Sequence, residues 1–169
     1  DHIAALSSAQ LAALSTAQFA AMTTAQIASI ETADFATLTT DVIVALSTAQ
    51  IQALSFEQLG ALTAEQTAAI ETADIAALTT DQITFLGTAQ IGALTSAQVA
   101  ALTTAQIAAL DFTAVAALST AVVPALTTAQ VQALTTDQLS FLTTAQLAAM
   151  ETQDVAALTT AQIVALAPR

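Results

Sequence analysis

The chain has 169 residues with a formal net charge of −12 at pH 7, and Arg169 is its only Lys or Arg. Without clustered basic residues it lacks the means to bind phosphate, so nucleic acid is not expected as a partner. Cys is absent, which excludes disulfide bonds, and no apolar run approaches the roughly 18 residues of a membrane span.

One octapeptide recurs from end to end, and Leu102 to Ala109 (Leu-Thr-Thr-Ala-Gln-Ile-Ala-Ala) is a typical copy. A large apolar residue begins each copy, always eight residues after the last. These residues are Leu6, Leu14, Met22, Ile30, Leu38, Leu46, Leu54, Leu62, Ile70, Leu78, Leu86, Leu94, Leu102, Leu110, Leu118, Leu126, Leu134, Leu142, Met150, Leu158 and Leu166. A fixed period indicates a repeat architecture, so residues 1–169 are predicted to form a single array of about 20 octads.

Each octad carries the signature of a helix start. In the copy at Leu102, Thr103 precedes Gln106 by three residues, the spacing of a capping box. Leu102 and Ile107 flank the cap at the spacing of a hydrophobic staple. The same capping pattern begins at Ser47, Thr95, Thr127, Thr143 and Thr159. A helix of about six residues is therefore expected in every octad.

A single continuous helix is the main alternative, because Ala, Leu and Gln are good helix formers. At 3.6 residues per turn, however, a step of eight rotates successive large residues by about 80°, so no single stripe could bury them. A period of eight also differs from the repeats of coiled coils, and the scarcity of Gly and Asn disfavours a β-solenoid. The predicted fold is all-α, a solenoid of short capped helices, one per eight-residue repeat, stacked because such helices are unstable alone.

The first octads are close to consensus. Asp1 is not a start Met and His2 stands where an octad carries Gln, so the chain is expected to be a processed product or a piece of a longer array. Phe19 and Phe35 replace the usual Ile and are expected to fill the core.

An acidic residue replaces the hydroxyl cap at Glu31, Glu71, Asp111 and Glu151, always 40 residues apart, so five octads form a super-repeat. Two interpretations remain open. The acids either favour the positive ends of helix dipoles, by about 0.3–1 kcal/mol each, or help to collect Ca²⁺, which needs six to eight oxygens and hence another turn. The candidate Ca²⁺ ligands are Glu31, Asp34, Glu71, Asp74, Glu151 and Asp154. No cofactor is expected.

Four phenylalanines occupy positions that are otherwise small or polar. Phe56 and Phe112 replace the second Thr of their octads, and Phe85 and Phe141 replace the final Ala. They either fill wider parts of the core or project outward and anchor a neighbouring chain, since aromatic residues are enriched in interface cores. On the second interpretation they are the candidate interface residues.

Two octads depart from the pattern further along the chain. Thr67 replaces the apolar staple residue, so a looser core is expected there. Pro124 lacks a backbone N–H, so its octad is expected to be bent or irregular.

The residues of a catalytic site are missing. His2 is the sole His, and the many Ser and Thr residues have no neighbouring base to activate them. Gly60, Gly87 and Gly92 are scattered singly and form no phosphate loop. An enzyme is not expected.

The phrases Leu-Thr-Thr-Ala-Gln-Ile-Ala-Ala-Leu, from Leu102, and Leu-Thr-Thr-Asp-Gln, from Leu78, resemble octapeptide arrays of large secreted or cell-surface bacterial proteins, including adhesin-like exoproteins. The resemblance covers nearly the whole chain and implies an extracellular structural role. We expect a rod or stalk segment or a self-assembling subunit of an extracellular filament; the alternative is a protein- or peptide-binding module of a surface adhesin. Because the first and last octads resemble the others, end-to-end self-association is expected.

Overall fold

The computed structural model describes residues 2–166, and over that range it is helical, without a strand. Every octad but one forms a short α-helix. The α-helices are α1 (Ser8–Ala12), α2 (Thr16–Ala20), α3 (Thr24–Ala28), α4 (Thr32–Phe35), α5 (Thr40–Ala45), α6 (Thr48–Gln52), α7 (Phe56–Ala61), α8 (Ala64–Ala69), α9 (Thr72–Ala77), α10 (Thr80–Thr84), α11 (Thr88–Gly92), α12 (Ser96–Ala101), α13 (Thr104–Ala109), α14 (Phe112–Ala117), α15 (Thr128–Ala133), α16 (Thr136–Ser140), α17 (Thr144–Ala149), α18 (Thr152–Ala156) and α19 (Thr160–Ala165). Two 3₁₀ helices, η1 (Ile3–Ala5) and η2 (Val123–Ala125), complete the set.

Local sequence explains where each helix begins and ends. At α13 the Thr103 hydroxyl accepts from the Gln106 backbone N–H at 3.1 Å, and the Gln106 side-chain oxygen accepts from the Thr103 N–H at 2.7 Å. The capping box predicted here is confirmed. The helix ends at Leu110, which has extended backbone angles and turns the chain toward the next cap. No described residue has a positive φ, so these bends do not require glycine.

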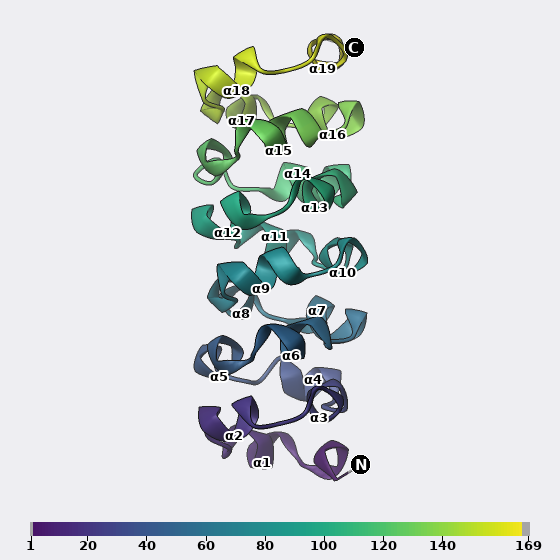
Figure 1. The fold of residues 1–169 in the computed structure, drawn as a ribbon, viewed down its shortest axis with the longest axis vertical. Coiled ribbons are helices and arrows are strands. Elements are labelled where there is room, and N and C mark those ends of the chain that lie inside the picture. The colour runs from purple at the N-terminus through teal and green to yellow at the C-terminus, as the bar shows by residue number, and fades with distance from the viewer. Residues whose placement is uncertain (1, 167–169) are drawn as a thin grey trace.

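The helices coil into a solenoid whose turn takes between three and four octads. Most helices pack against the one three octads later, as α10 does against α13 and α11 against α14. The turns stack into an elongated rod with the two chain ends at opposite tips (Figure 1). The predicted solenoid of one short helix per repeat is confirmed.

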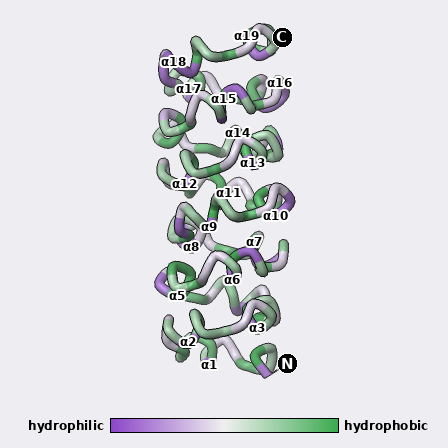
Figure 2. Tube along the Cα trace, viewed as in Figure 1, coloured by the Kyte–Doolittle hydropathy of each residue, from purple (hydrophilic) through white to green (hydrophobic). Residues whose placement is uncertain are grey.

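Two apolar side chains from most octads build one continuous core. The staple residue Ile107 is 0% exposed and the helix-ending Leu110 is 3% exposed. Hydrophobic segments recur in every layer of the stack (Figure 2). Phe19 and Phe35 are fully buried, as expected from their place in the octad.

The two irregular octads behave differently. Thr67 is expected to loosen the core, but it is completely buried, and its hydroxyl donates to the Thr63 carbonyl at 2.9 Å. That hydrogen bond satisfies the polar atom, so the core closes around it. The prediction for Pro124 is confirmed, because its octad contains only the 3₁₀ helix η2. No helix within residues 2–166 is long and apolar enough to cross a membrane.

Candidate functional site: glutamine clamps and phenylalanine pairs

Beyond the first turn, the glutamine of each capping box also joins adjacent turns of the solenoid. The Gln106 side-chain nitrogen donates to the carbonyl oxygens of Ile75 and Leu78, both at 2.8 Å. Its oxygen remains engaged by the Thr103 N–H. Gln106 is 1% exposed, so all its polar atoms must be paired, and they are. We call this arrangement a glutamine clamp.

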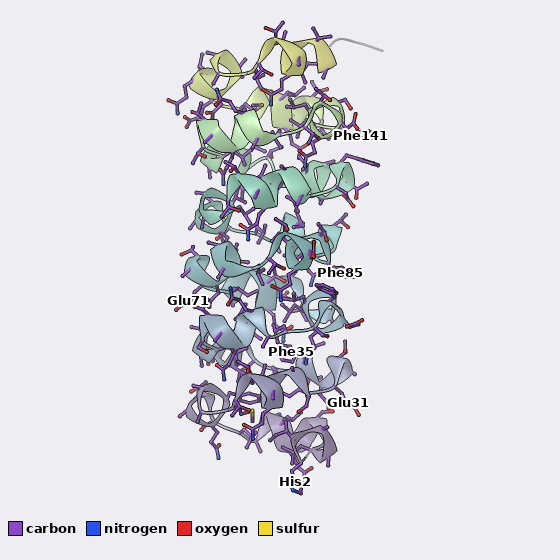
Figure 3. All side chains as sticks on the ribbon, turned by 45° about the vertical axis from the view of Figure 1, so that its right-hand side comes forward. His2, Glu31, Phe35, Glu71, Phe85 and Phe141 are labelled. Carbon is purple, nitrogen blue, oxygen red and sulfur yellow. The ribbon has the colours of Figure 1, made fainter. Side chains whose placement is uncertain are left out.

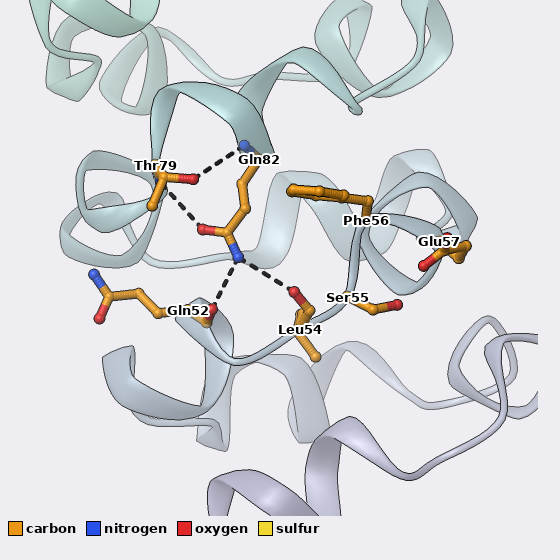
Figure 4. Close-up of a pocket in the computed structure, with 7 residues that line it drawn as sticks. All are labelled: Gln52, Leu54, Ser55, Phe56, Glu57, Thr79 and Gln82. Carbon is orange, nitrogen blue, oxygen red and sulfur yellow. Dashed lines mark hydrogen bonds between the residues drawn. The ribbon is translucent and has the colours of Figure 1, made fainter.

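The clamp recurs along the rod with nearly constant spacing. Each amide reaches a carbonyl 28 residues earlier and a second one 30 or 31 residues earlier; Figure 4 shows Gln82 bound to Gln52 and Leu54 in this way. The clamp residues are Gln50, Gln58, Gln66, Gln82, Gln90, Gln98, Gln106, Gln130, Gln138, Gln146 and Gln162. Buried hydrogen bonds therefore connect successive turns throughout the rod.

The clamp does not follow from the capping-box pattern, because a capping box accepts Glu or Gln equally well. Glu could accept the cap N–H, but its carboxylate could not donate to two carbonyls. The third helical position carries Gln in most octads and never Glu, although Glu occurs nearby at Glu57 and Glu65. This preference for Gln was the signal that could have revealed the clamp.

The candidate Ca²⁺ ligands are distributed between different environments. Asp74 replaces a clamp glutamine, lies buried, and accepts from the Thr48 hydroxyl at 2.6 Å; Asp154 accepts from Thr128 at 2.8 Å. Asp34 accepts from the Ser8 hydroxyl in the same manner.

The glutamates that precede these aspartates are separated from one another. Glu31, Glu71 and Glu151 are exposed and accept no cap hydrogen bond from their own helices. Glu31 and Glu71 lie on opposite sides of the rod, because five octads are not a whole number of turns (Figure 3). Within residues 2–166 no three acidic or His side chains gather to hold a metal ion.

Asp111 has a different role from the other acids of the super-repeat. Its side chain accepts from the Thr113 hydroxyl at 2.6 Å and from the Ala114 backbone N–H at 2.7 Å, which caps α14. These two hydrogen bonds lower the pKa of the Asp111 carboxyl. Asp111 is therefore a helix cap.

The four candidate interface phenylalanines lie outside the core. Phe56 and Phe85 stack with ring centroids 4.3 Å apart and planes at 6°. Phe112 and Phe141 stack at 4.1 Å and 27°. The rings are between 39% and 51% exposed. The four rings therefore project outward and do not fill the core, while their role as interface residues stays a prediction.

A groove opens beside one of these pairs. It has a volume of about 440 Å³ and lies between the cap of α7 and the cap of α10, beside the exposed ring of Phe56 (Figure 4). Its lining residues are Gln52, Leu54, Ser55, Phe56, Glu57, Thr79 and Gln82. A hydrogen bond from its own backbone N–H and another from Ser55 lower the pKa of Glu57, so the rim carries negative charge.

The chain matches the family model of the ALTTAQ repeat over residues 1–30, 27–64, 67–104, 86–112, 107–144 and 139–168. It belongs to the ALTTAQ repeat family. In the ALTTAQ unit at Ala101 to Gln106, the first Thr is the helix cap and the final Gln is the clamp residue. No curated protein and no solved structure matches the chain.

Proposed function

We propose that this chain is a non-catalytic structural rod, either a rod or stalk segment of a bacterial surface protein or a self-assembling subunit of an extracellular filament. The observation that carries the proposal is the series of glutamine clamps along one continuous core. Bending such a rod would separate buried amides from buried carbonyls, and unpaired buried polar groups are costly. The clamps thus favour stiffness.

The two tips of the described rod carry complementary groups whose clamp partners are absent from residues 2–166. At the first turn, the amide nitrogens of Gln10, Gln18 and Gln26 have no acceptor within residues 2–166, because that range holds no carbonyl 28 to 31 residues before them in the clamp position. At the last turn, the carbonyls of Val155 and Ile163 receive no glutamine amide from the described residues. These tips fit either the neighbouring octads of a longer array or the opposite tip of another copy.

The apolar surface of the last turn supports the same stacking. Val155 is 43% exposed and Ile163 is 49% exposed, whereas the equivalent Ile107 inside the rod is fully buried. Covering these side chains would remove apolar surface from water. A tip-to-tip contact joins different surfaces of two copies, so it propagates into an open fibre.

Two further features support an extracellular location. The sequence resembles octapeptide arrays of secreted and cell-surface bacterial proteins. The single Lys or Arg also leaves trypsin-like proteases almost no cleavage site.

Small-angle scattering and light scattering of the 169-residue chain test the proposal. Stacked helices spaced 8–10 Å apart give a rod of roughly 50–60 Å for about six turns. Tip-to-tip association predicts that the length of the particles increases with protein concentration while their cross-section stays constant. A compact or flexible particle would contradict the rod.

A pair of variants separates tip stacking from general solubility. Ile163→Asp places a charge in the stacking surface and should stop lengthening. Val164→Asp is the matched control, because it adds the same charge to the same octad at a side chain that faces solvent. Equal lengthening of both variants would contradict tip stacking.

A second candidate role is a protein- or peptide-binding module of a surface adhesin. The exposure of two stacked phenylalanine pairs favours it.

A further inference from the structure

We propose that the two phenylalanine pairs form a two-site docking surface for a basic, arginine-bearing segment of a partner protein. This surface goes beyond the structural role, because a rod needs no exposed aromatic residues along its side. Four of the six phenylalanines lie outside the core, and they are the four that stack in pairs.

The two pairs share the same construction. In each, the rings come from octads one turn apart, 29 residues along the chain. The second pair follows the first by 56 residues, which is twice the 28-residue offset of the clamp bonds. Phe85 and Phe141 accordingly lie on one side of the rod (Figure 3). The sites are therefore presented in parallel to a single partner.

Each pair has one exposed carboxylate four residues before its second ring, and a second exposed carboxylate next to its first ring in the sequence. Asp81 precedes Phe85 by four residues and Asp137 precedes Phe141 by four, a spacing that makes side chains neighbours on a helix surface. Glu57 directly follows Phe56 in the sequence. In the second pair, Asp111 directly precedes Phe112. Both sites combine an aromatic stack with negative charge.

The chain cannot neutralise these carboxylates itself. Residues 2–166 contain no Lys or Arg. Side-by-side contact with a second copy would bring two surfaces of a −12 chain together, which electrostatic repulsion opposes. A partner that docks on this surface must therefore supply the positive charge.

Arginine fits this combination better than lysine. Its planar guanidinium stacks on an aromatic face and also forms two parallel hydrogen bonds to a carboxylate. The spacing of the sites restricts the partner further. Two turns of helices packed 8–10 Å apart separate the sites by roughly 16–20 Å, which about five or six residues of extended chain can span. We infer a segment with arginines about six residues apart.

Fluorescence anisotropy with synthetic labelled peptides tests the inference. The main probe carries two arginines separated by five Gly and Ser residues. Comparison peptides replace both arginines with lysine or glutamate, or keep only one arginine. Simultaneous contact with two sites should make the two-arginine peptide bind at least about tenfold more tightly than the one-arginine peptide. Lysine should bind more weakly, and glutamate should not bind.

Protein variants locate the binding site. Phe85→Ala combined with Phe141→Ala should weaken binding at least tenfold. Asp81→Asn combined with Asp137→Asn should weaken it several-fold and reduce its dependence on salt. Val44→Ala removes another exposed apolar side chain outside the pairs and should leave affinity unchanged. Circular dichroism verifies that every variant remains folded.

Three outcomes would overturn the inference. They are equal binding of the glutamate peptide, unchanged affinity of the folded double-Phe variant, and side-by-side dimerisation that the double-Phe variant abolishes. The peptide measurements do not depend on rod polymerisation, so failure here leaves the structural proposal standing, and the reverse also holds.

Discussion

The side-chain nitrogen of Gln106 donates a hydrogen bond to the carbonyl oxygen of Ile75, 31 residues earlier, at 2.8 Å. The same side chain caps its own helix through its oxygen. In most octads one residue type therefore both caps the helix and holds the preceding turn in place. This double use explains how helices of only four to six residues persist in a long stack.

Gln106→Leu should lower the free energy of unfolding by about 2–4 kcal/mol, because two buried carbonyls and one cap N–H each lose a hydrogen bond. Urea unfolding followed by circular dichroism measures the change. Gln18→Leu is the matched control, since Gln18 occupies the same octad position at an exposed tip and clamps nothing. Its cost should be about 1 kcal/mol or less. Equal costs would show that the clamp adds nothing to the cap.

Asp74→Gln should stabilise the protein by about 1 kcal/mol, because the new amide reaches the carbonyls of Ile43 and Leu46 as clamps do elsewhere. It gives up the bond from Thr48, which offsets part of the gain. Thermal melts of the wild type, Asp74→Gln and Asp74→Ala measure the order of stability. A glutamine variant that melts below the alanine variant would refute the predicted clamp geometry at this site.

Asp111→Ala should cost about 1 kcal/mol at pH 7, because it removes the cap of α14. The hydrogen bonds that lower the pKa of Asp111 stabilise its ionised form in the folded state. Its contribution is therefore present above about pH 4 and declines as the pH falls below that value. The measurement is the difference in unfolding free energy between wild type and variant, taken at pH 7 and again at pH 2.5. Charge repulsion common to both proteins cancels in this difference. A difference that grows on acidification would contradict this assignment.

Calcium should leave the melting temperature unchanged. Asp74 and Asp154 accept from threonine hydroxyls, and no described group of three acids surrounds a common point. Circular dichroism melts with added Ca²⁺ and with EDTA measure the effect. A Ca²⁺-dependent rise that Asp74→Asn removes would restore these acids as metal ligands.

Local rules predicted the helices well, because a cap such as Thr103 and its Gln106 lie three residues apart. The number of octads per turn was not predictable, since it depends on the angle at each Leu bend summed over many residues. For the same reason, sequence alone left the exposure of Phe85 undecided. The partners of Gln106 and Asp74 were missed because they lie 26 to 31 residues away.

Hydrogen exchange of the glutamine side-chain amides, followed residue by residue by NMR, tests most directly whether clamps hold the turns together. Gln50, Gln106 and the other buried clamp amides should exchange far more slowly than Gln10 and Gln18 at the exposed tip. Uniformly fast exchange, with clamp and tip amides alike, would contradict the inter-turn hydrogen bonds on which the rod depends.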